Sequence, residues 1–117
     1  MKNLRFKEDG ETMLLTVEKE VQHRTTILKV KGLIDITTTG ILDPYLEEIN
    51  EMDTVILDFS GLEFIDSTGI GAIMNAIYAS EEKNFKLKLQ EIDGLTNELF
   101  ETVGLYEILA AFHGEVI

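Results

Sequence analysis

The sequence predicts a single α/β domain in which helices pack against a mixed, mostly parallel sheet. Strand-like and helix-like segments alternate along the chain in the order ββαβαβαβ. Right-handed crossovers between parallel strands place such helices against the sheet. The 117 residues suffice for one compact core and are too few for two domains. We therefore treat residues 1–117 as one domain.

The first two segments are typical of a β-hairpin. Thr, Val, Leu and Ile recur with a period of two in residues 12–20 and again in residues 25–31. This period is that of strands whose alternate side chains face a core. A turn at residues 22–24 joins the two strands, and Gly32 is expected to end the second one.

A helix is expected to begin at Thr38 or Thr39. Pro44 falls in its first turns, where a proline is tolerated if the helix begins close to it. The apolar side chains that follow recur at the spacing of one helix face and are Ile41, Leu42, Tyr45, Leu46 and Ile49.

Residues 53–60 are expected to form the central strand of the sheet. The run VILDF at residues 55–59 is short, apolar and rich in β-branched side chains, as in a strand covered on both faces. A second amphipathic helix should start near Ser67 or Thr68. Its apolar face comprises Ile70, Ile73, Met74, Ile77 and Tyr78.

The last third of the chain predicts a strand, a helix and a final short strand. Phe85, Leu87 and Leu89 alternate with polar residues, as in a half-buried strand. The final strand is expected at residues 108–112. The helix between these strands should end at Gly104, and its apolar face comprises Leu95, Leu99, Phe100 and Val103.

The composition excludes several classes of function. With 10 basic and 22 acidic residues the net charge is −12, which argues against nucleic acid or an anionic membrane surface as a partner. The absence of Cys excludes disulfides and thiolate catalysis and fits a reducing cytosol. No secretory segment is recognisable, and the longest nearly uncharged stretch, residues 67–80, is shorter than a bilayer span. We expect a cytoplasmic protein.

The acidic residues are concentrated in one part of the sequence. No Lys or Arg occurs between Lys31 and Lys83, whereas eleven Asp and Glu residues do. A solvated acidic face is one explanation. A surface that meets a basic partner is the other, and the sequence leaves both open.

The known catalytic and cofactor motifs are missing. With His23 and His113 as the only histidines, neither a Ser-His-acid triad nor a zinc site has enough members. Neither a GxxxxGK[ST] phosphate loop nor a GxGxxG fingerprint occurs. We expect no metal and no cofactor.

The segment Asp66-Ser67-Thr68 lies where a loop enters the second helix, and two explanations apply to it. Asp and Ser are preferred N-caps, and loss of such a cap costs about 0.5–2 kcal/mol. Alternatively, Ser67 is an exposed hydroxyl at a helix start, where free amides and the helix dipole tolerate a phosphate.

Three motifs resemble those of the STAS domain, and specifically of bacterial anti-sigma factor antagonists. The segment FIDSTGIG at residues 64–71 resembles the family signature Asp-Ser-Ser/Thr-Gly-Leu/Ile-Gly, which follows a hydrophobic strand. The segment GLID at residues 32–35 is similar to the family's Gly-Glu-Leu-Asp, with Leu33 in place of the acid. FETVGL at residues 100–105 resembles a helix that ends in Gly-Leu before a final strand. The resemblance covers nearly the whole chain.

The resemblance implies a binding protein whose unphosphorylated form binds an anti-sigma factor that is also a serine kinase, which frees a sigma factor. Ser67 would accept the phosphate, and a serine phosphatase is a further partner that the resemblance allows. Asp35, Asp66, Thr68 and Gly69 would contact the kinase. Because no Lys or Arg of residues 32–82 could pair with the phosphate, we expect its charge to repel the docked partner.

Two other functions stay open. One is a constitutive STAS adaptor in a transport or signalling assembly, in which Ser67 is only a helix cap. The other is a module that binds a nucleotide or small ligand with the free amides of residues 67–71. The lack of nearby basic residues counts against the second alternative.

Overall fold

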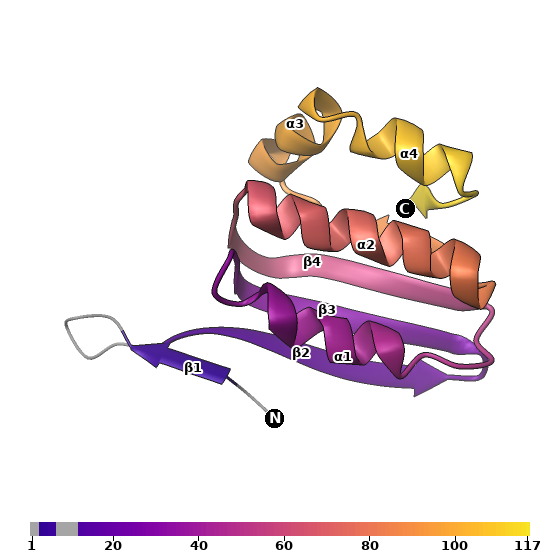
Figure 1. The fold of residues 1–117 in the computed structure, drawn as a ribbon, viewed down its shortest axis with the longest axis horizontal. Coiled ribbons are helices and arrows are strands. Elements are labelled where there is room, and N and C mark those ends of the chain that lie inside the picture. Colours follow the sequence, from indigo (N-terminus) through magenta and orange to yellow (C-terminus); the bar gives the residue numbers. More distant parts are fainter. Residues whose placement is uncertain (1–2, 7–11) are drawn as a thin grey trace.

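The computed structural model describes residues 3–6 and 12–117, with side chains from Leu15 onward. Figure 1 shows the elements in their arrangement. In chain order they are β1 (Asn3–Phe6), β2 (Thr12–Gln22), β3 (Thr25–Ile34), α1 (Thr39–Glu47), β4 (Thr54–Ile65), α2 (Ser67–Lys83), β5 (Lys86–Gln90), α3 (Gly94–Thr102), α4 (Leu105–Ala111) and β6 (Glu115–Val116).

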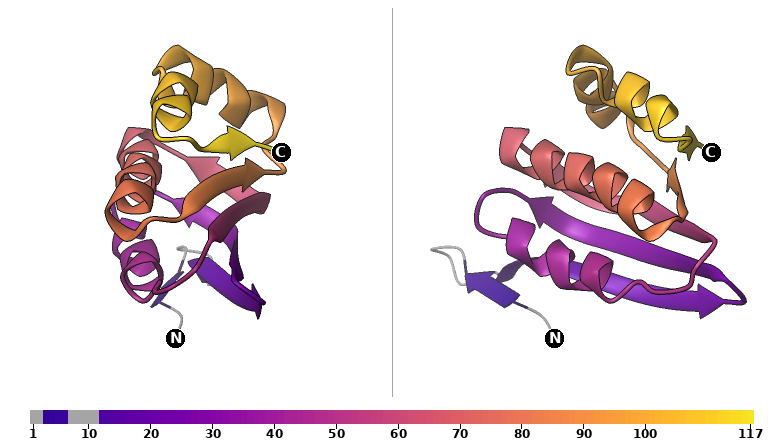
Figure 2. Two further views of the ribbon diagram at one scale, coloured as in Figure 1. Left: turned by 90° about the vertical axis from the view of Figure 1, so that its right-hand side faces the viewer. Right: turned by 45° about the vertical axis from the view of Figure 1, so that its right-hand side comes forward.

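The six strands form one mixed sheet in the order β1-β2-β3-β4-β5-β6. The pairs β1/β2 and β2/β3 are antiparallel, and the three pairs from β3 to β6 are parallel. The helices α1 and α2 cover one face, and α3 and α4 continue this layer past β5 (Figure 2). The α/β fold class, with helices packed on a mostly parallel sheet, is confirmed.

The core lies between this helical layer and the sheet. Alternate positions of the central strands are fully buried, as the period of two predicts. Edge-to-face packing of Phe59 on Phe100, with ring centroids 6.0 Å apart, joins α3 to β4. The fully buried side chains of the three parallel strands β3 to β5 include Leu28, Val30, Val55, Leu57, Leu87 and Leu89.

The other face of the sheet carries no helix (Figure 2), so the expectation that the central strand is covered on both faces is wrong. Rows of acids and lysines on neighbouring strands pair across this face. The ion pairs are Lys29–Glu20 at 3.5 Å, Lys31–Glu18 at 3.1 Å, Lys86–Glu115 at 3.5 Å and Lys88–Glu115 at 3.2 Å. Most described lysines are therefore neutralised within this face, which leaves the excess of acids to the helices and loops.

The strands β3 and β4 extend further than predicted, to Ile34 and Ile65, because bulges interrupt their pairing without ending it. The register between them shifts twice, after Lys29 and after Gly32. Gly32 was expected to end the strand but lies inside it, with a φ of 102° that suits glycine. The segment after residue 60, expected to be a loop, is the second half of β4.

The Asp58 side chain accepts a hydrogen bond from a backbone amide at the first bulge. Its Oδ1 accepts a hydrogen bond from the Ser60 amide at 2.8 Å, and its Oδ2 accepts one from Gln90 Nε2 at 2.9 Å. Burial disfavours the charged form of this carboxyl group. The hydrogen bonds from Ser60 and Gln90 and the charge of Lys29 outweigh that effect, so the pKa of Asp58 lies below its usual value.

The predicted strand at residues 108–112 is wrong, because this segment belongs to α4 and the turn after it. Leu105 and Leu109 are four residues apart and both buried, which is the spacing of a helix face. Gly104, with a φ of 75°, forms the junction between α3 and α4. The last strand is the two-residue β6, and β1 was not predicted.

The expected apolar faces of two helices are partly wrong. In α3, Phe100 is buried, but Leu95 and Val103 are 72% and 45% exposed. In α2, Ile73 and Ile77 are buried, but Tyr78 is 48% exposed.

The helix α1 begins at Thr39, as predicted, with Pro44 inside it rather than in its first turn. Its last turn is held by α2, because Lys83 Nζ donates to the carbonyl oxygens of Glu47 at 2.7 Å and Ile49 at 3.0 Å. Within the described part of the chain, every helix is too short or too polar to traverse a bilayer.

Candidate functional site

Two loops that carry predicted site residues leave the sheet at the same edge. Ile34 and Ile65 are register partners at the ends of the parallel strands β3 and β4, so Asp35 and Asp66 follow at neighbouring positions. The Asp66 amide donates to the Ile34 carbonyl oxygen at 3.3 Å, which ties the two loops together. Figure 1 shows the starts of α1 and α2 side by side at this edge.

Asp66 is the N-cap of α2. Its backbone is extended, and its Oδ1 accepts a hydrogen bond from the Gly69 amide at 2.9 Å. Ser67 and Thr68 are the first two residues of the helix, and both are exposed. Among the described residues, none forms a hydrogen bond with the Ser67 hydroxyl. The cap explanation therefore holds for Asp66 and not for Ser67.

Asp35 shapes the turn between β3 and α1. Its Oδ1 accepts hydrogen bonds from the Thr37 amide at 2.9 Å and from the Thr37 hydroxyl at 2.6 Å. The buried hydroxyl of Thr38 accepts from the Asp35 amide at 2.9 Å and donates to the Leu33 carbonyl oxygen at 2.8 Å. The Asp35 carboxylate thus has a structural role and remains half-exposed beside the start of α2.

Gly69 is buried where α2 meets the sheet. A Cβ atom at this position would overlap the carbonyl oxygen of Ile34 and lie 2.7 Å from Cγ1 of Ile65. The structure thus places Gly69 in the packing beneath Ser67, whereas it leaves Thr68 on the surface.

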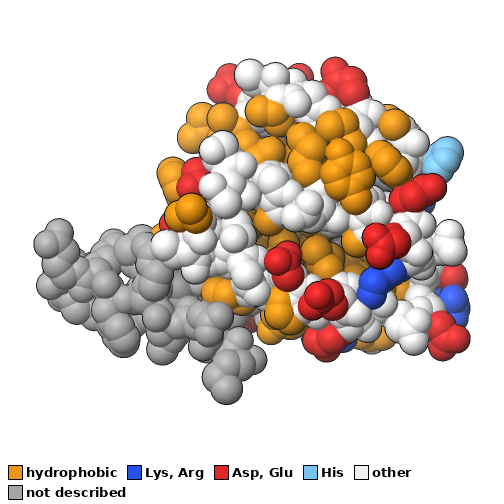
Figure 3. All heavy atoms as spheres, viewed as in Figure 1, with side chains coloured by type: hydrophobic (Ala, Val, Ile, Leu, Met, Phe, Trp, Pro, Cys, Tyr) orange, Lys and Arg blue, Asp and Glu red, His pale blue; other side chains and the backbone are white. Residues whose placement is uncertain are grey.

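Three exposed apolar side chains lie at or just after the carboxyl ends of the parallel strands. Ile36 follows β3, Phe64 is the penultimate residue of β4, and Leu95 is the second residue of α3, which follows β5. Their exposed fractions are 74%, 52% and 72%. We call these residues, together with Ser67 and Thr68, the carboxyl-end surface. In Figure 3, hydrophobic side chains gather at the left side of the molecule, above the grey atoms. This is the region where α2 and α3 begin in Figure 1.

Sequence reasoning missed the apolar part of the carboxyl-end surface. The helical spacing predicts that Leu95 lies on a buried helix face. From the sequence, Phe64 is recognised only as the first residue of the FIDSTGIG motif. A signal was present, because Phe64 lies next to Glu63 and near Asp66 in a segment that contains no Lys or Arg from residue 32 to residue 82. A large exposed apolar side chain in such a setting is typical of a contact surface.

The Asp66 carboxylate limits what the start of α2 can bind. It accepts the hydrogen bond of the Gly69 amide, so this amide is not available to an anionic ligand. Of the described residues, no group of three or more His, Asp or Glu side chains is placed to hold a metal ion.

Comparison with known proteins identifies the family. The family model of the STAS domain matches residues 16–116. The chain belongs to the STAS domain family. A sequence relative of this STAS domain is the anti-sigma F factor antagonist of Paenibacillus polymyxa, which is 22% identical over 107 residues, 89% of this chain and 92% of that protein.

Solved structures share the STAS fold. The anti-sigma factor antagonist SpoIIAA in its unphosphorylated form has a TM-score of 0.65 and 17% identity, with 87% of each chain covered. A sulfate transporter family protein from Wolinella succinogenes has a TM-score of 0.71 and 21% identity, with 84% of this chain and 80% of that chain covered. The same fold therefore serves both antagonists and transporter family proteins.

Proposed function

We propose that this STAS domain is an anti-sigma factor antagonist controlled by phosphorylation of Ser67. Its unmodified form binds an anti-sigma factor that is also a serine kinase, and this binding frees a sigma factor in the cytoplasm. The observation that carries the proposal is the division of roles at the start of α2. Asp66 caps the helix, whereas the Ser67 hydroxyl is exposed and free of hydrogen bonds to described residues.

A phosphate on Ser67 is compatible with the fold. The hydroxyl lies at the first position of α2, where the helix dipole favours negative charge. The cap hydrogen bond from Gly69 to Asp66 does not involve Ser67. Modification therefore changes the surface and leaves the helix start in place.

The same phosphate weakens binding of a partner. It adds about −1.5 to −2 charges between Asp66 and Thr68, in a segment without Lys or Arg from residue 32 to residue 82. A partner that covers the apolar side chains of Phe64 and Ile36 would have to desolvate this charge. Because no Lys or Arg of residues 32–82 can pair with the phosphate, the cost of desolvating it favours release of the partner over a new intramolecular pairing.

The other predicted residues act in two ways in this proposal. Thr68 is exposed beside Ser67 and can touch the partner directly. The half-exposed Asp35 offers a carboxylate beside the same helix start. Asp66 and Gly69 contribute by holding Ser67 in place, through the cap and the close packing on β3.

The similarity to the Paenibacillus antagonist and to SpoIIAA, which has an unphosphorylated and a phosphorylated form, supports this function. The likeness to a sulfate transporter family protein favours a second candidate, a constitutive adaptor in which Ser67 is never modified. Neither candidate requires an active site, so we expect the chain to catalyse no reaction itself.

Intact-mass analysis tests the proposal. The chain is incubated with Mg-ATP and serine-kinase anti-sigma factors from the same cell, in parallel with Ser67→Ala and the control Thr102→Ala, which removes an exposed hydroxyl at the end of α3. We expect one phosphoryl addition in the unchanged chain and in Thr102→Ala, and none in Ser67→Ala, which circular dichroism should show to be folded. Absence of any addition to the unchanged chain would overturn the proposal in favour of the constitutive adaptor. A serine phosphatase of that cell should remove the added mass.

A further inference from the structure

The exposed side of α2 extends from Ser67 to the opposite end of the helix. Residues 67, 71, 78 and 82 are all exposed and are spaced to lie on one stripe of the helix. A partner that contacts Ser67 and lies along this stripe reaches the C-terminal turn of α2. With a rise of 1.5 Å per residue, the 14 steps from Ser67 to Glu81 span about 21 Å.

An aromatic pair stands at that far end. Tyr78 of α2 and Phe112, which follows α4, meet edge to face with ring centroids 5.5 Å apart. Tyr78 is 48% exposed, and Phe112 is partly exposed. In Figure 3 a group of hydrophobic side chains lies over α2 and α4, away from the carboxyl-end surface.

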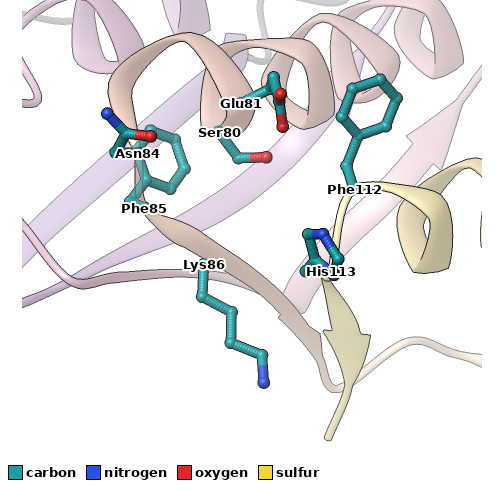
Figure 4. Close-up of a pocket in the computed structure, with 7 residues that line it drawn as sticks. All are labelled: Ser80, Glu81, Asn84, Phe85, Lys86, Phe112 and His113. Carbon is teal, nitrogen blue, oxygen red and sulfur yellow. The ribbon is translucent and has the colours of Figure 1, made fainter.

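A pocket of about 270 Å³ opens beside this pair. Figure 4 shows Glu81 directed toward the space between α2 and the rings of Phe112 and His113, with Phe85 beside Asn84 on the other side of Ser80. Lys86, which also lines the pocket, points away from that space (Figure 4), and its Nζ lies 3.5 Å from Glu115. The pocket thus presents one carboxylate and aromatic surface.

This chemistry fits a cation with an apolar stem. A guanidinium or ammonium group pairs with a carboxylate and stacks on aromatic rings, while its methylene groups cover apolar surface. Arg stacks on rings more readily than Lys because its charged group is planar and weakly hydrated. Glu81 forms no ion pair with any described Lys or Arg, so its carboxylate is available.

We propose that this pocket is a socket for an arginine side chain of the partner that docks along α2. This inference rests on the proposed function, which supplies the partner. It adds that the surface of this partner carries an arginine side chain. A second copy of the chain fits poorly, because each copy carries a net charge of −12 and the two copies would repel each other. The partner therefore presents a basic side chain about 21 Å from its contact with Ser67.

An NMR titration of the full chain tests the socket without the partner. The probes are N-acetyl-argininamide and its neutral isostere N-acetyl-citrullinamide. We expect saturable shifts of the amide signals around Glu81, Asn84 and His113 with the first probe only, at roughly millimolar concentrations. Glu81→Gln should weaken binding roughly two- to fivefold, whereas the adjacent Glu82→Gln should leave it unchanged.

Three outcomes overturn the socket. They are equal shifts with both probes, equal weakening by the two substitutions, and shifts spread over the acidic surface. Because the titration does not involve Ser67, its result is independent of phosphorylation. Absence of phosphorylation with the arginine shifts intact would reject the proposed switch and leave the pocket as a cation site. Phosphorylation without the shifts would reject the socket alone.

Discussion

Gly69 packs its backbone directly on the carbonyl oxygen of Ile34, leaving no room for a side chain. This contact joins the start of α2 to the end of β3. The same carbonyl oxygen accepts the hydrogen bond from the Asp66 amide. The position of Ser67 on the surface therefore depends on a close approach between a helix and the neighbouring strand.

Replacing Gly69 by Ala should destabilise the fold. The added methyl group must displace the end of β3 or the side chain of Ile65, and such overpacking costs about 1–3 kcal/mol. Gly71→Ala is a matched control, because its Cβ atom would meet nothing within 4 Å and alanine favours the helix. Urea denaturation gives the free energy of unfolding of both variants. Equal stability of Gly69→Ala and the unchanged chain would refute the close approach.

The cap of α2 predicts different effects for two substitutions of Asp66. Ala removes the acceptor for the Gly69 amide and should cost about 0.5–2 kcal/mol of unfolding free energy. Asn keeps an acceptor at the same place and should lower the free energy of unfolding by only a few tenths of a kcal/mol. Thermal or urea unfolding compares the two variants. A loss as large in Asp66→Asn as in Asp66→Ala would show that the cap is not the cause.

Asp58 should make the stability depend on pH. Its pKa is lowered in the fold, so its ionised form stabilises the protein above the usual pKa of Asp, and this contribution is lost as the pH falls through the folded-state pKa. Asp58→Asn should cost about 1–2 kcal/mol at neutral pH. The difference from the unchanged chain should shrink below about pH 4. Denaturant titrations at a series of pH values from neutral to below about 4 measure the stability difference between the two proteins. A difference that does not change with pH would contradict a lowered pKa of Asp58.

The carboxyl-end surface should contribute to partner binding and little to folding. Phe64→Ser and Leu95→Ser remove exposed apolar side chains and should each weaken binding of the unmodified chain roughly fivefold or more. Val103→Ser is the control, because Val103 is also exposed but lies at the other end of α3. Calorimetric titration with the kinase partner gives the affinities. If the control weakened binding as much as Phe64→Ser, the proposed surface would be misplaced.

Local periodicity predicted most of the elements, because burial on one side imposes a period on strands and helices. The alternation of β5 and the apolar face of α1 are examples. The second half of β4 was not predictable in this way. Its bulges, next to Gly32 and Gly61, break the alternation while the pairing continues. Residues 108–112 were misassigned because a short apolar run fits a strand as well as a buried helix.

The centre of the site could be predicted, but its surroundings could not. Asp66 and Ser67 carry a local signal, since the chemistry of a helix cap is set by neighbours in the sequence. The exposure of Leu95 and Tyr78 depends on how whole helices pack, and a helical period cannot tell a core residue from one at the margin of the core. Both residues fit the expected buried faces and are nevertheless exposed.

The most direct test of the account compares how the unmodified and the Ser67-phosphorylated chain bind the same kinase partner in isothermal titration calorimetry. We expect phosphorylation to weaken binding roughly tenfold to a hundredfold, which corresponds to about 1.4–2.8 kcal/mol. Ser67→Ala should bind like the unmodified chain, because the hydroxyl is neither a cap nor otherwise paired with described residues. Equal affinity of the phosphorylated and unmodified chains would contradict the proposal that Ser67 is a binding switch.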